Sequence, residues 1–170
     1  MRIASGQLAA SRSGASAYVP GCGRGHDAVA LAKAGWQVTA IDVVAELADD
    51  LSAKLEPFGG CFIVGDALAP QAKAFDLIWE HTFLCALDPD QRQAWAAMVQ
   101  SSLAPGGQLA VLIFPANKGP EAGGPPWGYT ASDLEKLLGS DFELQESAAV
   151  DPELEPRNWD QRFALFRYGG

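Results

Sequence analysis

Three closely spaced glycines, Gly21, Gly23 and Gly25, are the residues of this sequence most suited to binding a ligand. They follow an apolar run, residues 15–19, and precede a stretch of helical period, residues 27–34. Glycine lets the backbone come close to a ligand, and the N–H groups at the start of a helix attract an anion. The sequence therefore predicts a ligand-binding loop between a strand and a helix.

The spacing of these glycines argues against a dinucleotide. A dinucleotide fingerprint has the pattern G-x-G-x-x-G, and counting from Gly21 puts His26 where the third glycine should be. The observed G-x-G-x-G suits a ligand that presents an amino-acid end, because a carboxylate at a helix N-terminus gains roughly 0.3–1 kcal/mol. NAD is therefore the weaker candidate.

Acidic residues follow the next two apolar runs. Asp42 closes the run 37–41, where a carboxylate can accept hydrogen bonds from ribose hydroxyls; the alternative is a cap for the helix that begins at Val44. Asp66 and Ala67 follow the third run and place a carboxylate and a backbone N–H where they can flank an adenine, although Gly-Asp is also a common turn. Open α/β sheets bind ligands at this edge, so the three strand ends predict one crevice.

Apolar runs alternate with stretches of helical period, which is the pattern of βαβ units around a mostly parallel sheet. The predicted strands cover residues 15–19, 37–41, 61–64, 75–79 and 108–114. The predicted helices cover residues 27–34, 44–56, a segment that starts at Asp88 and ends before Pro105, and residues 132–138. Residues 142–150 and 161–168 predict two more strands with no helix between them, and hence an antiparallel pair at one edge.

Composition excludes several classes of protein. The 170 residues suffice for one domain, expected to cover residues 1–170. Twelve Lys and Arg against 21 Asp and Glu give a net charge of −9, which disfavours nucleic acid and anionic membranes as partners. The longest apolar stretch, residues 109–114, is far below the roughly 20 residues that cross a bilayer. Three cysteines without C-x-x-C spacing predict a cytoplasmic protein with no metal.

At these motifs the chain resembles the class I S-adenosylmethionine-dependent methyltransferases, and more narrowly the thiopurine S-methyltransferase and thiol/halide methyltransferase family. The resemblance covers residues 18–127. It rests on VPGCGRG at residues 19–25, FDLIWEHTFLCALDP at residues 75–89 and GGPP at residues 123–126. The segment LAPGG at residues 103–107 occurs across class I methyltransferases generally.

The resemblance implies a Rossmann-like, doubly wound α/β sheet of seven mostly parallel strands with an antiparallel strand at the edge. It also implies S-adenosyl-L-methionine as the cofactor. The implied cofactor-binding residues are Gly21, Gly23 and Gly25 at the methionine moiety, Asp42 at the ribose, and Asp66 with Ala67 at the adenine. His81 matches a position that touches the cofactor in relatives; the alternative is a loop histidine that fixes its own backbone. Relatives carry a longer Trp-containing segment before the first strand, so with residues 1–14 alone we expect the cofactor lid to be missing or truncated.

The crevice is predicted to be poor in bases. The titratable candidates near it are His81, Glu80 and Asp88, with no second histidine or tyrosine placed to form a dyad, since Tyr129 lies in a long loop. A thiol with a pKa near 8.5 is already a few per cent thiolate at pH 7, so a soft sulfur acceptor needs a base less than an amine or alcohol does. We therefore expect methyl transfer to a small soft nucleophile: a thiol, hydrosulfide, thiopurine-like thione, selenium species or halide.

Phe83, Pro126 and Trp127 are candidates for the wall of the acceptor pocket, because small-molecule sites are largely apolar. Ordinary packing of a long loop is the alternative. Two other functions stay open: a domain that binds the cofactor without catalysis, and an O- or N-methyltransferase of a small metabolite. The sequence assigns no catalytic residue.

Overall fold

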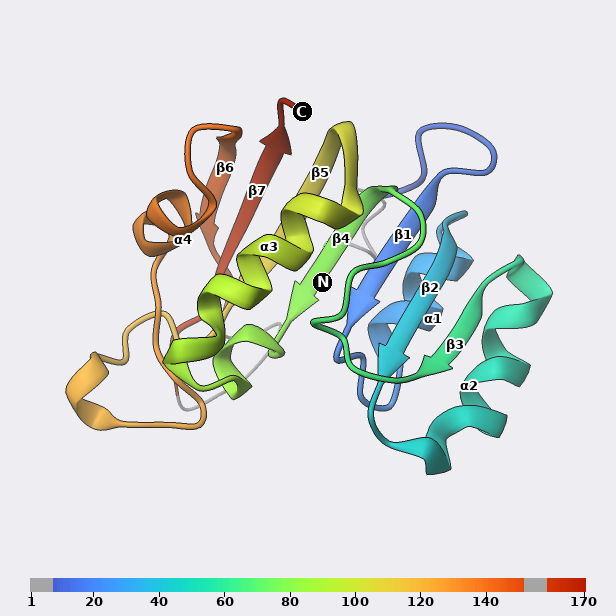
Figure 1. Ribbon diagram of the computed structural model, residues 1–170, viewed down its shortest axis with the longest axis horizontal. Helices are drawn as coiled ribbons and strands as arrows, with labels where there is room; N and C mark the ends of the chain where they lie inside the picture. The colour runs from blue at the N-terminus through green and yellow to red at the C-terminus, as the bar shows by residue number, and fades with distance from the viewer. Residues whose placement is uncertain (1–7, 152–158) are drawn as a thin grey trace.

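The computed structural model of the chain describes residues 8–151 and 159–170. Its strands form one seven-stranded sheet in the order β3-β2-β1-β4-β5-β7-β6 (Figure 1). The strands are β1 (Ser16–Pro20), β2 (Gln37–Asp42), β3 (Cys61–Val64), β4 (Phe75–His81), β5 (Leu103–Ile113), β6 (Phe142–Ala149) and β7 (Arg162–Tyr168). The α-helices are α1 (His26–Lys33), α2 (Ala48–Leu55), α3 (Arg92–Ser102) and α4 (Ala131–Leu138).

The strand directions follow from the connections. Strands β1 to β5 pair in parallel, as expected where helices or long crossovers join them. Strand β7 pairs antiparallel with both β5 and β6, so the reversed strand lies second from the edge and β6 forms the edge. The predicted seven-stranded, mostly parallel sheet with an antiparallel pair at one edge is therefore confirmed.

Helices cover both faces of this sheet. Helix α3 lies in front of the sheet and α1 behind it (Figure 1). One hydrophobic cluster joins the sheet to α3 and α4 through residues such as Trp95 and Leu134. A second cluster joins the opposite face to α1 and the residues around it, among them Leu31 and Trp36. The loops at the carboxyl ends of the strands are thus anchored from two packed layers.

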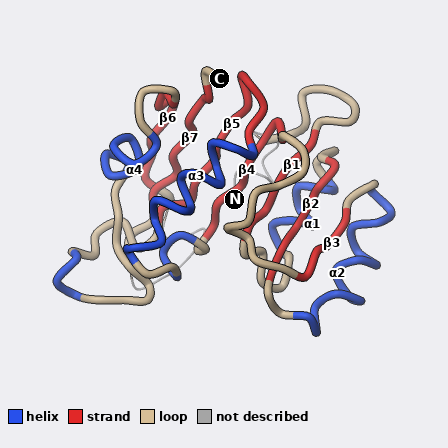
Figure 2. The backbone as a smooth tube through the Cα atoms, in the orientation of Figure 1, coloured by secondary structure: helices blue, strands red, loops and turns tan. Residues whose placement is uncertain are grey.

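The connection between β3 and β4 is a loop. The described residues 65–74 form turns and bends, drawn in tan in Figure 2. They cross to the face that carries α3, where Ala67 joins the buried cluster. Ile63 and Val64 of the edge strand β3 stay exposed.

Strand β4 is longer than its predicted range, residues 75–79. Glu80 and His81 continue the strand because they pair with Val111 and Leu112 of β5. Side chains alternate between the two faces of a strand, so Glu80 and His81 point to opposite layers. This extension decides the surroundings of both side chains.

Several other boundaries also differ from the sequence expectation. Helix α2 begins at Ala48 rather than at Val44, because a 3-10 turn, η1 (Ala45–Leu47), precedes it. Strand β5 begins at Leu103 rather than at residue 108, because Leu103 pairs with Phe75 before the register shifts. Helix α3 begins at Arg92 rather than directly after Asp88. The Asp88 N–H donates to Gln91 Oε1 at 3.3 Å and closes a short 3-10 turn, η4 (Pro89–Gln91), ahead of the α-helix.

Candidate functional site

The glycine loop turns sharply between β1 and α1. Gly21, Gly23 and Gly25 have φ angles of 56°, 50° and 70°, in the left-handed region that favours glycine. The Cys22 N–H donates to the Ile41 carbonyl at 3.0 Å, which ties the loop to β2. The residue types that marked this loop in the sequence are therefore required by its backbone.

The three glycines differ in what surrounds them. A Cβ atom on Gly21 would lie 2.3 Å from the Phe83 ring, and one on Gly25 would lie 2.3 Å from Leu51. A Cβ atom on Gly23 would meet no atom within 4 Å. Gly21 and Gly25 therefore accommodate protein side chains, and Gly23 borders open space from which a ligand can approach the backbone.

Asp42 links the end of β2 to the glycine loop. Its Oδ2 atom accepts the Gly23 N–H at 2.8 Å, and its Oδ1 atom accepts the Val44 N–H at 3.1 Å. The second contact is the capping interaction that the sequence left as an alternative. Each carboxylate oxygen can accept more than one hydrogen bond, so the side chain retains capacity for ligand hydroxyls.

Asp66 and Ala67 lie in the loop after β3. Asp66 Oδ1 accepts the Leu68 N–H at 2.9 Å. This hydrogen bond forms the turn that the sequence analysis gave as the alternative for Gly-Asp. The Ala67 carbonyl accepts the buried Tyr18 hydroxyl at 3.0 Å, and burial raises the pKa of Tyr18 well above its ordinary value. Tyr18 thus anchors this loop to β1, with the Asp66 side chain on the exposed side.

His81 forms a pair with Asp27, and this pair was missed by sequence reasoning. His81 Nδ1 lies 2.5 Å from Asp27 Oδ2, and the Trp79 indole N–H donates to the same oxygen at 3.0 Å. The sequence analysis considered only a second histidine or tyrosine as a partner and assigned Asp27 to the start of a helix, so it did not anticipate a carboxylate at this position. The two-residue extension of β4 sets His81 opposite the first turn of α1.

The environment of Asp27 favours its ionised form. Burial alone would raise the pKa of Asp27, but the hydrogen bonds from His81 and Trp79 and the nearby charges of His81 and His26 hold it below its ordinary value. The side chain of His81 is 14% exposed, so the ring is largely enclosed but still reaches the surface.

Glu80 does not belong to the crevice where the sequence placed it. Its carboxylate is fully buried and accepts the N–H groups of Phe83 and Leu84 at 2.9 and 3.0 Å and the Trp95 indole N–H at 3.1 Å. Burial raises the pKa of Glu80 above its ordinary value, against the three donors, which lower it. Glu80 therefore holds the loop after β4 in place and faces α3.

Asp88 and Tyr129 lie around the start of α3. Asp88 is exposed and precedes η4, the turn that leads into this helix. Tyr129, in the loop before α4, is buried, and the guanidinium of Arg92 in the first turn of α3 lies 6.0 Å from its ring centre.

The residues expected to line an acceptor pocket come from two loops that the structure brings together. The Phe83 ring packs over Gly21, beside the glycine loop. The Trp127 N–H donates to the Cys85 carbonyl at 2.7 Å, and the Pro126 carbonyl accepts from Lys118 Nζ at 2.8 Å. Phe83, Pro126 and Trp127 are all partly exposed, which suits the wall of a pocket as well as it suits loop packing.

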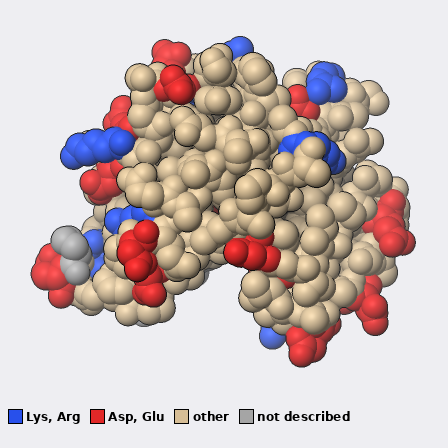
Figure 3. Space-filling model, viewed as in Figure 1, with Lys and Arg blue, Asp and Glu red and all other residues tan. Residues whose placement is uncertain are grey.

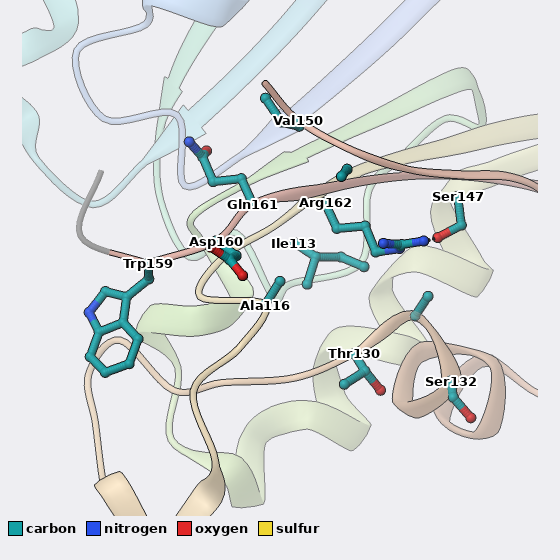
Figure 4. Close-up of a pocket in the computed structure, with 12 residues that line it drawn as sticks. Ile113, Ala116, Thr130, Ser132, Ser147, Val150, Trp159, Asp160, Gln161 and Arg162 are labelled. Carbon is teal, nitrogen blue, oxygen red and sulfur yellow. Dashed lines mark hydrogen bonds between the residues drawn. The ribbon is translucent and has the colours of Figure 1, made fainter. Parts of the chain in front are cut away.

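A separate cavity of about 690 Å³ lies near the carboxyl end of β5, between α4 and the β6–β7 pair (Figure 4). Arg162 lines it and donates from Nε to Ser147 Oγ at 2.7 Å. Thr130 and Trp159 border it from opposite sides (Figure 4). Its lining shares no residue with the glycine loop, and the sequence did not predict it because its residues come from distant segments.

Among residues 8–151 and 159–170, no group of three or more His, Cys, Asp or Glu side chains is placed to hold a metal ion. No helix among the same residues combines the length and apolar character needed to span a bilayer.

The strand order, the glycine loop after β1 and the acid at the end of β2 define the Rossmann-like fold of the class I methyltransferases. Solved structures share this fold. The N-methyltransferase NodS from Bradyrhizobium japonicum WM9, in complex with S-adenosyl-L-homocysteine, aligns with a TM-score of 0.80 at 21% identity, over 99% of this chain and 85% of that one.

Sequence comparison specifies the family. The model for Thiopurine S-methyltransferase (TPMT) matches residues 6–167. The chain is 35% identical over 127 residues to Probable thiol methyltransferase 2 of Arabidopsis thaliana and 36% identical over 129 residues to Thiocyanate methyltransferase 1 of the same plant. Each alignment covers 72% of this chain and 55% of the relative. The chain belongs to the thiopurine S-methyltransferase family and spans about half the length of these curated relatives.

Proposed function

We propose that this protein binds S-adenosyl-L-methionine in the crevice at the carboxyl ends of β1, β2 and β3 and transfers its methyl group to a small soft nucleophile. The observation that carries the proposal is the Asp42 carboxylate bonded to Gly23, at the one glycine of the loop that borders open space. The names of the relatives support the acceptor class, since they specify thiol and thiocyanate methyltransferases.

The residues present fit the cofactor. The glycine loop has room beside Gly23 for the methionine moiety, and Asp42 has remaining acceptor capacity for ribose hydroxyls. The Asp66 carboxylate, exposed at the end of β3, suits the amino group of adenine, with the Ala67 N–H beside it. When bound, the cofactor supplies a methyl group activated by a sulfonium.

The protein's own part in the reaction is alignment and exclusion of water. Methyl transfer from a sulfonium is an in-line displacement, for which a correct approach angle and a dry site supply most of the rate enhancement. Phe83 provides apolar surface for this purpose beside Gly21, and the loop with Pro126 and Trp127 is bonded to Cys85, two residues after Phe83. A sulfur acceptor, a selenium species or a halide suits such surroundings because it sheds water more readily than a hard nucleophile.

Calorimetric titration with S-adenosyl-L-methionine tests the cofactor site. We expect Asp42→Ala to weaken binding about 10- to 100-fold, because a charge-assisted hydrogen bond contributes roughly 1.5–3 kcal/mol. The matched control is Asp50→Ala, which removes an exposed acid of α2 that pairs only with Lys54 at 2.6 Å.

Asp42 also supports the backbone, so Asp42→Asn serves as the conservative variant, and thermal unfolding establishes that each variant is folded. No heat at high micromolar ligand with the unaltered protein would refute the proposed cofactor. Unchanged affinity in both Asp42 variants would remove this residue from the ribose.

The acceptor is tested by incubating the protein and cofactor with sulfide, alkyl thiols, thiocyanate and iodide, and analysing the headspace for methylated products. A panel of phenols and amines is run alongside. Products from the soft acceptors alone support the proposal. Methylated phenols or amines would identify an O- or N-methyltransferase, and cofactor binding without any product would identify a silent domain.

We further propose that residues 1–170 act as one domain in the reducing cytoplasm with a small-molecule substrate. No disulfide joins Cys22, Cys61 and Cys85, all of which lie in the described part of the chain. The charge of −9 supports a partner that is neither nucleic acid nor an anionic membrane.

A further inference from the structure

His81 stands at the carboxyl end of β4, where the loop that carries Phe83 begins. Thr82, which follows it, has a φ of 65° and is the one non-glycine residue of the described chain with a positive φ. Such a backbone is strained for a β-branched residue, and strain of this kind clusters at functional sites. The turn at Thr82 directs His81 toward α1 and Phe83 toward Gly21, so both side chains flank the glycine loop.

The contact with Asp27 fixes the protonation pattern of the His81 ring. Asp27 Oδ2 already accepts from the Trp79 indole and lies 2.5 Å from His81 Nδ1. An ionised carboxylate only accepts hydrogen bonds, so the proton of the pair belongs on Nδ1. A neutral ring with its proton on Nδ1 carries its basic lone pair on Nε2.

We propose that His81 is the proton acceptor for a thiol methyl acceptor and that Asp27 is the residue that positions its ring. This inference rests on the proposed function and extends it to protonated acceptors. The thiol S–H bond breaks, an N–H bond forms at Nε2, and the electron pair stays on sulfur. The resulting thiolate then forms the bond to the methyl carbon while the bond between that carbon and the sulfonium sulfur breaks, and the electron pair of the broken bond stays on that sulfur. The imidazolium later returns its proton to solvent.

The surrounding charges suit this role. Asp27 faces the ring from α1 in ionised form, because the hydrogen bonds from His81 and Trp79 help to hold its pKa below the ordinary value despite burial. Glu80, the neighbour on β4, points into the opposite layer and its carboxylate is bonded to three N–H groups. His26 of α1 is exposed and contributes a second, weaker positive charge near Asp27. The strand on the other side offers the apolar Leu112.

The kinetic test compares an acceptor that carries a proton with one that does not. An alkyl thiol must lose a proton, whereas thiocyanate is already an anion. At pH 6.5 we expect His81→Gln to lower kcat/KM about 100-fold with the thiol, as for the loss of a general base. With thiocyanate we expect a change of less than about threefold, because no proton moves and a general base has no role.

The pH profile and the matched variants sharpen the comparison. The loss with the thiol should shrink above about pH 8.5, where the thiol ionises in water without help. Asp27→Asn should lower kcat/KM by a smaller factor, about 10-fold, and only with the thiol. The base itself remains in this variant, and only the orientation of its ring is lost. The control is His26→Gln, since His26 is the other of the two histidines in the chain and lies next to Asp27.

A spectroscopic readout needs no turnover. Long-range ¹H–¹⁵N correlation spectra of the ¹⁵N-histidine-labelled protein report which ring nitrogen carries the proton, and His81→Gln assigns the signals. We expect the proton of His81 on Nδ1, and its redistribution in Asp27→Ala. A proton on Nε2 in the unaltered protein would overturn the inference.

The outcomes separate the two proposals. Equal losses with thiol and thiocyanate, or weaker cofactor binding in His81→Gln with no acceptor dependence, would overturn the role of His81 and leave the proposed function standing. No methyl transfer from the unaltered protein to any acceptor would overturn the proposed function and the inference together.

Discussion

Asp27 and Glu80, two acidic residues near the end of β4, differ in how burial and hydrogen bonding affect their ionisation. Asp27 is held ionised by donors from His81 and Trp79, whereas the pKa of Glu80 is raised because burial outweighs its three donors. Both assignments follow from the alternation of side chains along β4, which sends His81 to one layer and Glu80 to the other. One acid pairs with the His81 ring, and the other supports a loop.

The raised pKa of Glu80 predicts a pH dependence of stability. The folded state binds this proton more tightly than the unfolded state, so the contribution of Glu80 to the free energy of unfolding falls as the pH rises above about 4.5. Glu80→Gln should destabilise the protein by about 1–3 kcal/mol, because the amide oxygen replaces only one carboxylate oxygen. If that oxygen accepts from Phe83 and Leu84, the NH2 group faces the Trp95 indole N–H and leaves this buried donor unsatisfied. The deficit should be larger at pH 5 than at pH 7.

Urea unfolding at pH 5, 6 and 7 measures this difference. Glu143→Gln is the control, because Glu143 is an exposed residue of β6 and its replacement should leave the pH dependence of the unaltered protein intact. A deficit for Glu80→Gln that grows from pH 5 to pH 7 would contradict the raised pKa.

At the scale of the elements, the glycine loop is set by backbone conformation and by two packing contacts. Gly25 accommodates Leu51 of α2 and Gly21 accommodates Phe83, so the loop is fixed between α2 and the segment after β4. Gly23 alone keeps open space at a positive φ. A methyl group at Gly23 would therefore meet no other part of the protein and would project into the space from which, under the proposed function, the cofactor approaches.

This separation predicts the effect of Gly23→Ala. The substitution should destabilise the protein by about 1–2 kcal/mol through left-handed backbone strain alone. It should also weaken binding of S-adenosyl-L-methionine at least 10-fold, because the added methyl group occupies the space beside the backbone. Gly14→Ala is the matched control: Gly14 has a φ of 74° and nothing within 4 Å of its Cβ position, but it precedes β1, at the strand end opposite the glycine loop.

Thermal unfolding and calorimetric titration of the two variants separate backbone strain from ligand exclusion. If the two variants have similar stabilities and only Gly23→Ala loses binding, the result supports a ligand in the open space beside Gly23. Equal binding by both variants would show that the ligand does not approach Gly23.

The sequence predicted the elements well where a periodic pattern is bounded by turn residues. The glycine loop, the helix after it and the antiparallel pair at the end of the chain all follow from such local patterns. The pairing of Asp27 with His81 did not, because it depends on where β4 ends relative to α1. The extra strand residues Glu80 and His81 are fixed by their partners in β5, and that is a property of the sheet rather than of the segment.

The contacts made by the loops also depend on the packed fold rather than on local sequence, so they could not be predicted. Phe83 was predicted as a pocket residue from its type, and its contact with Gly21 could not be read from spacing. The cavity beside Arg162 assembles residues from β5, α4, β6 and β7, so no single stretch of sequence signals it.

For the whole molecule, the strand order places the candidate site at the switch point of the sheet. The chain runs outward from β1 to β2 and β3 on one side, then returns to β4 and β5 on the other. Open α/β sheets bind ligands at such a point because the adjacent loops diverge there. The glycine loop and Asp42 belong to one side and His81 with Phe83 to the other, so a cofactor and an acceptor would be held by different halves of the sheet.

The overall charge predicts for which acceptors kcat/KM should rise with ionic strength. Acidic side chains are distributed around the visible face of the molecule, and the chain carries a net charge of −9 (Figure 3). This field opposes the approach of an anion and leaves a neutral thiol unaffected. Raising the ionic strength from about 0.02 to 0.2 M shortens the screening length from roughly 20 Å to about 7 Å.

We therefore expect kcat/KM for thiocyanate to rise about twofold or more over this range, as screening removes the repulsion. The value for a neutral alkyl thiol, measured at pH 6.5 in the same buffers, should stay nearly constant and serves as the control. Potassium acetate is the salt of choice because acetate is a hard, poor methyl acceptor. A thiocyanate rate that falls with salt would instead show that a local positive field at the site overrides the charge of the whole molecule.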